Sequence, residues 1–152
     1  MPGYTADTGG LTRESWLTPQ RDRFRADASA RAAFFDSLGL PPMRTGELRI
    51  SLFSYQNAAL PGLLQAWASG DETVSVLVPR GKALPVVAAW LGCADLQPGT
   101  SWQRGALTLH VLPMLDQDAY DRLLWACDLN FVRGEDSFTR AQFAARPLVW
   151  QA

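Results

Sequence analysis

Short apolar segments alternate with helical segments along most of this chain, and this alternation limits the possible folds more than any other feature. Between residues 47 and 151, every two successive strand-like runs are separated by a helix-like run. The expected strands are 47–53, 73–79, 106–113, 129–133 and 147–151, and the expected helices are 58–69, 82–92, 116–128 and 135–145. Because right-handed crossovers place helices on both faces of a parallel sheet, the sequence predicts an α/β, Rossmann-like fold.

The N-terminal part of the chain has a different character. The first 16 residues are rich in Gly and Thr, and residues 21–40 have the pattern of a helix that ends near Gly39, before two prolines. We interpret residues 1–24 as a linker from an N-terminal domain that this chain lacks, and residues 25–152 as one domain. This domain is expected to be truncated, because its last strand reaches the end of the chain without a closing helix.

Composition excludes several classes of function. The 152 residues carry a net charge of -1, so no overall positive field favours a nucleic-acid partner. No apolar run approaches the roughly 18 residues of a membrane span, and no signal peptide is visible, which indicates a cytoplasmic protein with no membrane partner. Two cysteines without a CxxC spacing and a single histidine predict neither a metal site nor a cofactor.

The turns that follow the strands are the places to look for a site, because ligands of open α/β sheets bind outside the carboxyl ends of the strands. These turns are 53–57, 79–82, 112–117 and 133–137.

The turn at 133–137 offers the most groups that could bind a ligand. Gly134 permits a tight turn, and the next residues open a helix whose free N–H groups can hold an anion such as a diphosphate. Arg133 is suited to pair with a phosphate, or alternatively with Glu135. Glu135 can accept hydrogen bonds from ribose hydroxyls, whereas Asp136 or Ser137 could simply cap the helix.

The turn at 53–57 repeats this design. Phe53 and Tyr55 share one face if the strand persists, so Tyr55 could donate its hydroxyl to a phosphate or sugar while Phe53 packs under a ring. The alternative is that both rings merely cover the edge of the sheet.

At this point the sequence resembles a known family. The run "CDLNFVRGEDSFTRAQFAARPLVW", with "PGYTADTGGL", "SLFSYQNAALPGLLQAW" and "AYDRLLWACDLNF", is similar to the EarP family of protein-arginine rhamnosyltransferases, which modify bacterial elongation factor P. The resemblance implies a GT-B fold of two facing Rossmann-like domains, an inverting transfer of L-rhamnose from dTDP-β-L-rhamnose to an arginine, and no metal. It covers the C-terminal, donor-binding half, so elongation factor P would dock mainly through the missing N-terminal half.

The resemblance also implies roles for individual residues. It places Phe53, Tyr55, Gln117, Arg133, Asp136 and Ser137 in the donor site, with Gln117 near the thymine, and marks Glu135 as catalytic or as ordering the site. Because the family's general-base aspartate lies in the missing half, we expect this chain alone to be inactive. The alternatives are another nucleotide-sugar-binding GT-B-type domain, which would take UDP, and a non-catalytic nucleotide-binding fragment.

Overall fold

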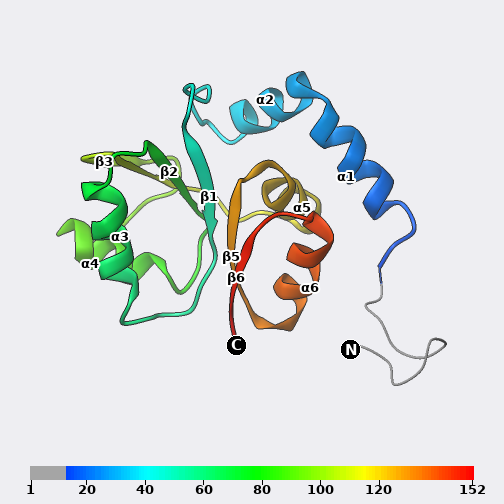
Figure 1. Cartoon of the computed structure of the whole chain (residues 1–152). Helices are drawn as coiled ribbons and strands as arrows, with labels where there is room; N and C mark the ends of the chain where they lie inside the picture. Colours follow the sequence, from blue (N-terminus) through cyan, green and yellow to red (C-terminus); the bar gives the residue numbers. More distant parts are fainter. Residues whose placement is uncertain (1–12) are drawn as a thin grey trace.

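The computed structural model describes residues 13–152 and contains a six-stranded sheet in the order β3-β4-β2-β1-β5-β6 (Figure 1). The strands are β1 Leu48–Leu52, β2 Val74–Val78, β3 Ser101–Arg104, β4 Leu107–Val111, β5 Leu129–Arg133 and β6 Leu148–Gln151. Every pairing between neighbours is parallel except that of β3 with β4. The predicted α/β, Rossmann-like fold is confirmed.

The sequence pattern did not reveal the edge strand β3. Because β3 pairs antiparallel with β4, the sheet is mixed and not wholly parallel. All four residues of β3 are exposed, and no apolar periodicity marks them. The strand forms a hairpin with β4 through Gly105, which has a φ of 57°. A β-carbon at Gly105 would lie 2.0 Å from the carbonyl oxygen of Ala68, so only glycine fits where this hairpin meets α3.

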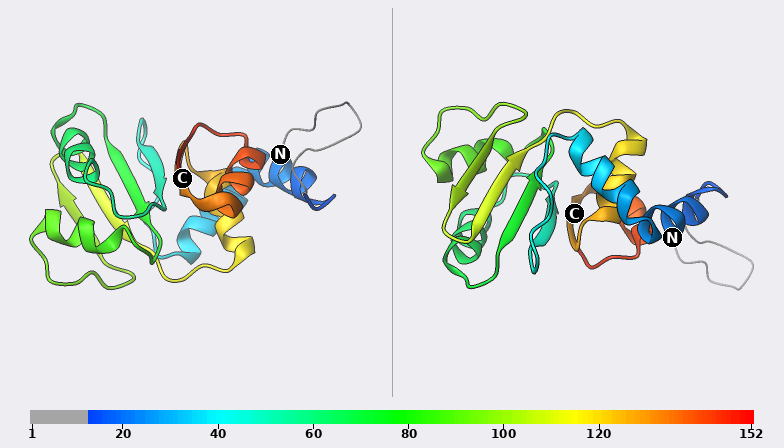
Figure 2. Two further views of the ribbon diagram at one scale, coloured as in Figure 1. Left: turned by 90° about the horizontal axis from the view of Figure 1, so that it is seen from below. Right: turned by 90° about the horizontal axis from the view of Figure 1, so that it is seen from above.

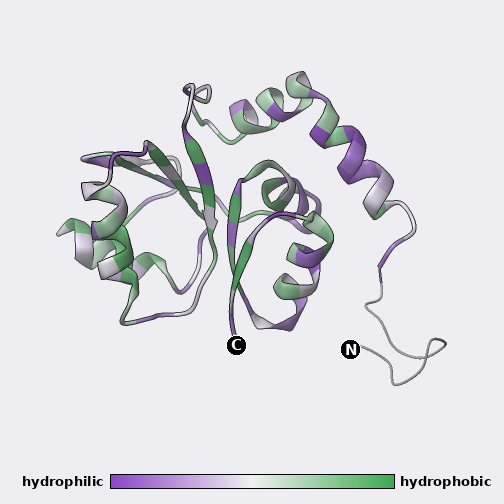
Figure 3. Ribbon diagram, viewed as in Figure 1, coloured by the Kyte–Doolittle hydropathy of each residue, from purple (hydrophilic) through white to green (hydrophobic). Residues whose placement is uncertain are grey.

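Helices cover both faces of the sheet (Figures 1 and 2). They are α1 Leu17–Ala26, α2 Ala28–Ser37, α3 Leu60–Ser69, α4 Leu84–Leu91, α5 Gln117–Ala126 and α6 Gly134–Ala144. One face carries α3 and α4 over Ile50, Leu52 and Val76, and the other carries α2 and α5 over Leu77. Figure 3 shows the contrast between the apolar strands and the hydrophilic α1. No helix within residues 13–152 is long and apolar enough to cross a membrane.

The N-terminal helical region consists of two helices where the sequence predicted one. The chain breaks at Asp27, which adopts an extended conformation and accepts a 3.0 Å hydrogen bond from the N–H of Ala30, capping α2. The first helix begins at Leu17, which is 1% exposed and packs with Leu124 and Trp125. The boundary drawn at residue 24 therefore falls inside α1, and residues 17–24 belong to the folded unit. The first 12 residues of the expected linker lie outside the described part of the chain.

A buried polar pair joins β1 to its neighbour β5. The hydroxyl of Ser51 in β1 lies 2.6 Å from Oδ1 of Asn130 in β5, and Nδ2 of Asn130 donates to the carbonyl of Leu124 at 2.9 Å. Both side chains are fully buried, so each needs its partner. This pair holds β5 in register against β1.

Candidate functional site

The chain reverses its direction across the sheet between β1 and β5. From β1 it runs through α3 to β2 and onward to β4, and it then returns through α5 to β5 on the opposite side of β1. The connections that leave β1 and β5 therefore diverge to opposite faces, and the general rule for open α/β sheets places ligands at this switch point, outside the carboxyl ends of the two strands; we call this place the crevice. Two of the four turns selected from the sequence, 53–57 and 133–137, meet at this crevice.

Arg133, the last residue of β5, is held between two aromatic rings. Its guanidinium carbon lies 4.5 Å from the ring centre of Phe53 and 4.5 Å from that of Tyr55. Both rings follow β1, so the parallel pairing of β1 with β5 creates this contact. The Nε atom of Arg133 is buried and has no hydrogen-bond partner within residues 13–152. Phe53, Tyr55 and Arg133 thus form one cluster with an unused hydrogen-bond donor.

The helix α6 begins directly after this arginine. Gly134 has a φ of 69°, as the tight turn required, and no side chain within residues 13–152 caps the first turn. The alternative of a helix capped by Asp136 or Ser137 is therefore not observed, nor does Arg133 pair with Glu135 among the described residues. The free N–H groups of this first turn directly follow Arg133 in the chain, and both kinds of donor attract an anion.

Tyr120 and Gly81 complete the surroundings of Phe53, and sequence reasoning missed both. The ring of Tyr120 lies 5.6 Å from that of Phe53, and burial raises the pKa of Tyr120 to about 12. A β-carbon at Gly81 would lie 3.3 Å from the Phe53 ring. Both residues are in or just after turns that the strand-end rule selects, and an aromatic residue one turn into α5 was the available signal for Tyr120.

The C-terminal strand β6 supports the same turns. The indole N–H of Trp150 donates to the carbonyl of Gly134 at 3.2 Å, and the Trp150 ring stacks on Phe138 at 4.4 Å. The N–H of Tyr55 donates to Oε1 of Gln151 at 2.9 Å. The last strand therefore holds both turns of the crevice in place.

Gln117 lies in an adjoining hollow and not in the aromatic cluster. It is the first residue of α5, and the hollow of about 520 Å³ beside it is also lined by Asp136, Thr139 and Arg140. The structure therefore brings Gln117 together with Asp136 of the turn at 133–137. It does not bring Gln117 into contact with Phe53 or Arg133.

The single histidine, His110, has a structural role. His110 is 5% exposed, and its Nδ1 lies 2.7 Å from the hydroxyl of Ser101; burial lowers the pKa of His110. No cluster of three or more His, Cys, Asp or Glu side chains that could hold a metal occurs between residues 13 and 152.

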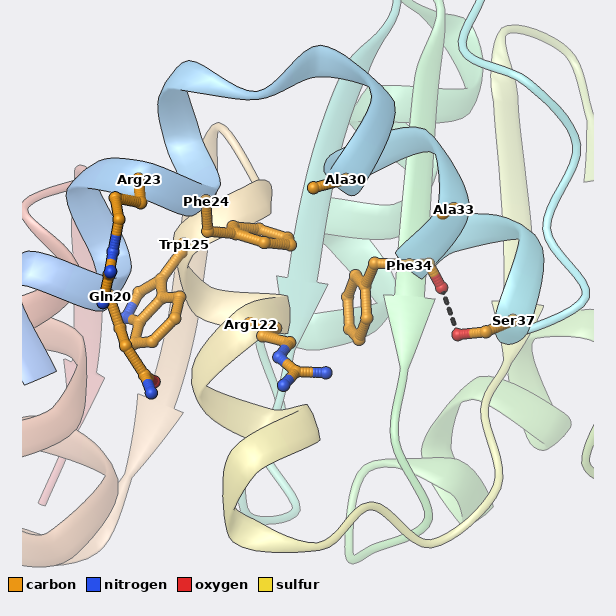
Figure 4. Close-up of a pocket in the computed structure, with 9 residues that line it drawn as sticks. All are labelled: Gln20, Arg23, Phe24, Ala30, Ala33, Phe34, Ser37, Arg122 and Trp125. Atoms are coloured by element: carbon orange, nitrogen blue, oxygen red, sulfur yellow. Dashed lines mark hydrogen bonds between the residues drawn. The ribbon is translucent and has the colours of Figure 1, made fainter.

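A second hollow lies between α1, α2 and α5 (Figure 4). Its walls include the rings of Phe24, Phe34 and Trp125, and Ser37 donates to the carbonyl of Phe34 at 2.6 Å. No residue of the four strand-end turns lines it. This hollow is therefore separate from the crevice.

The fold and the crevice define the class of this protein: a Rossmann-like α/β domain with an arginine and a helix N-terminus at its topological switch point. The model of one family, described as elongation factor P (EF-P) rhamnosyltransferase EarP, matches residues 1–152. The chain belongs to this family.

Individual relatives agree with the family assignment. The chain is 49% identical over 150 residues to the protein-arginine rhamnosyltransferase of Pseudomonas putida and 51% identical over 150 residues to that of Pseudomonas aeruginosa. Each match covers 99% of this chain and 40% of the relative, so the chain spans less than half the length of these proteins.

A solved structure has the same fold. It is described as the structural basis for EarP-mediated arginine glycosylation of translation elongation factor EF-P. The TM-score is 0.91 at 48% identity, and the match covers 98% of this chain and 48% of the solved one. This agreement extends the confirmation of the fold to nearly the whole chain.

Proposed function

We propose that this chain is the donor-binding part of a GT-B protein-arginine rhamnosyltransferase, which moves L-rhamnose from dTDP-β-L-rhamnose to an arginine of elongation factor P in the cytoplasm. One observation carries this proposal. Arg133, clamped between Phe53 and Tyr55, lies directly before the uncapped N-terminus of α6 at the switch point of the sheet. A nucleoside diphosphate has the charge and the aromatic base that such a crevice suits.

The diphosphate is the part of the donor that the crevice can hold most firmly. The first-turn N–H groups of Asp136 and Ser137 would donate to its oxygens, and Arg133 would offer the terminal N–H groups of its guanidinium. When rhamnose leaves, negative charge grows on the departing dTDP. Donors that are already in position stabilise this charge without a reorganisation penalty, which is how the site would accelerate the reaction.

Glu135 lies exposed in the first turn of α6, where it points away from the buried part of the helix. We assign it to the ribose hydroxyls or to the ordering of the reacting groups, because a carboxylate beside a diphosphate adds repulsion unless it accepts hydrogen bonds. The proposal requires no metal, since Arg133 and the helix N-terminus supply the positive potential.

Transfer to an arginine needs more than leaving-group stabilisation. A guanidinium is a poor nucleophile, because its pKa exceeds about 12 and a base must first take a proton. The acids of the first α6 turn are Glu135 and Asp136, and we assign them to the donor and not to deprotonation of the acceptor. We therefore expect these 152 residues alone to bind dTDP but not to rhamnosylate elongation factor P. Intact mass spectrometry of the acceptor would test this, and a mass gain would contradict it.

An NMR titration tests the donor site directly. Adding dTDP should shift the backbone amides of Glu135, Asp136 and Ser137, because their N–H groups donate to the phosphates. Thymidine, which lacks the diphosphate, should leave these amides unchanged. Equal binding of UDP and dTDP would favour another nucleotide-sugar-binding domain, and the absence of any amide shift with dTDP would refute the donor assignment.

A further inference from the structure

Four polar side chains form a chain of hydrogen bonds beside the hollow that Gln117 lines. Asp121 of α5 is only 2% exposed, and Arg140 of α6 donates to both of its carboxylate oxygens, at 2.9 and 2.6 Å. Gln117, one turn before Asp121, donates from Nε2 to Oδ1 of Asp121 at 3.3 Å. Arg140 also donates to Glu14 at 2.7 Å, which ties the N-terminal segment to the same network.

This network determines which way the amide of Gln117 faces. A carboxylate held by an arginine accepts hydrogen bonds and offers no proton, so only the amide nitrogen of Gln117 can face it. Turning the amide over would place Oε1 against the carboxylate of Asp121, two acceptors in contact. The amide is therefore fixed, with Oε1 and the second N–H of Nε2 free, and no group within residues 13–152 donates to this Oε1.

The free edge of the Gln117 amide faces a hollow that is large enough for the ring of a nucleotide base. Gln117 is exposed and lines the hollow of about 520 Å³ that also reaches Asp136 at the start of α6. A ligand whose diphosphate lies on the first turn of α6 can thus direct its base toward Gln117.

We propose that Asp121 and Arg140 are positioning residues that lock the Gln117 amide so that it reads the N–H and C=O of a thymine or uracil edge and rejects cytosine. This inference rests on the proposed function, because it assumes that a pyrimidine nucleotide occupies the site. It goes beyond that function by assigning the base selectivity to two residues that need not touch the donor.

The selectivity follows from the hydrogen-bonding pattern of the bases. Thymine and uracil present N3–H as a donor next to a carbonyl acceptor, which matches a free Oε1 next to a free N–H. Cytosine presents the reverse, with N3 as an acceptor next to an amino donor. Reading cytosine would require the amide to turn over, and Asp121 prevents this. A correctly oriented pair of hydrogen bonds discriminates between bases by about tenfold or more.

Isothermal titration with dTDP and dCDP tests the proposal. The unmodified chain should bind dTDP at least about tenfold more tightly than dCDP. In Asp121→Asn the side chain offers either an acceptor or a donor to Gln117, so the amide can turn and the ratio should fall to within about threefold. The matched control is Asp118→Asn, which changes an exposed acid of the same helix. It should leave the ratio unchanged.

A second variant keeps the test decisive if Asp121→Asn fails to fold. Gln117→Met replaces an exposed side chain by one of nearly the same length and removes both hydrogen-bonding groups. It should therefore also abolish the preference for dTDP over dCDP. An unchanged ratio in a folded Asp121→Asn or in Gln117→Met, or equal binding of dTDP and dCDP to the unmodified chain, overturns the inference. Failure of every nucleotide to bind the unmodified chain instead refutes the proposed function, which makes the two failures distinguishable.

Discussion

Replacing Arg133 by methionine separates the binding role of this residue from any role in stability. Methionine keeps an unbranched apolar chain between the rings of Phe53 and Tyr55 but removes the charge and the terminal N–H donors of the guanidinium. A hydrogen bond that involves a charged group contributes about 1.5–3 kcal/mol. The affinity for dTDP should therefore fall about 10- to 150-fold.

The stability of the fold should change little, because two effects oppose each other. The substitution removes two cation–π contacts at 4.5 Å, each worth about 0.5–2 kcal/mol. It also removes a buried Nε without a partner, which destabilises the native state by about 1–3 kcal/mol. The net change in the free energy of unfolding should be within about 1 kcal/mol.

Arg104→Met is the matched control. Arg104 also lies over an aromatic ring, with its guanidinium carbon 4.2 Å from the centre of Trp90, but it is in the edge strand β3. It donates to the carbonyls of Trp90 and Leu91 at 3.0 and 3.4 Å, at the C-terminal end of α4. This substitution should lower stability by about 0.5–1 kcal/mol and leave dTDP affinity unchanged.

Calorimetric titration with dTDP and urea unfolding of both variants measure the two quantities. The reasoning predicts that affinity falls only in Arg133→Met. It is refuted if Arg133→Met binds dTDP as tightly as the unmodified chain, or if Arg104→Met loses as much affinity, since the arginine would then have no specific contact with the phosphates.

Two further predictions concern the fold that carries the site. Because burial lowers the pKa of His110 in the folded state, the unfolded chain binds more protons below about pH 6.5. The free energy of unfolding should thus decrease as the pH falls from 7.5 to 5.5, and urea titrations of His110→Asn should show a weaker decrease; an identical slope would contradict the assignment. Gly134→Ala should lower the free energy of unfolding by about 1–2 kcal/mol, because the φ of Gly134 is 69°. The loss should be no larger, since the added β-carbon would come no closer than 3.7 Å to Tyr55. Gly105→Ala should lower the free energy of unfolding distinctly more, since its β-carbon would lie 2.0 Å from the backbone oxygen of Ala68. Equal losses of stability for the two variants in urea unfolding would disprove this ranking.

Local sequence patterns predicted most of the strands and helices of this fold. Apolar runs of strand length marked β1, β2, β4, β5 and β6, and β2 shows the reason most clearly, because a strand buried at every position is largely apolar along its length. The exposed strand β3 has no such constraint, and it was missed. The break at Asp27 was missed too, because the residues on both sides have good helical patterns and the break rests on one capping hydrogen bond.

The candidate site was predictable as a set of turns but not as an arrangement. The strand-end rule and the family resemblance both pointed to residues 53–57 and 133–137, and Gly134 was expected to have a positive φ for a local steric reason. The partner of Arg133 was left open between a phosphate and Glu135. Within residues 13–152 the structure shows no pairing with Glu135, and it places Arg133 between the rings of Phe53 and Tyr55, which are far from it in the sequence.

The sequence by itself determined the class of fold, the family and the turns that could carry chemistry, because periodicity, glycine positions and motifs are local properties of the chain. Only the tertiary structure decided that β5 returns to the side of β1, which brings Arg133 between Phe53 and Tyr55. It also decided that α5 packs against α6, which lets Arg140 hold Asp121 and so orient Gln117. Strand order and helix packing depend on how the whole core is buried, and no local segment contains that information.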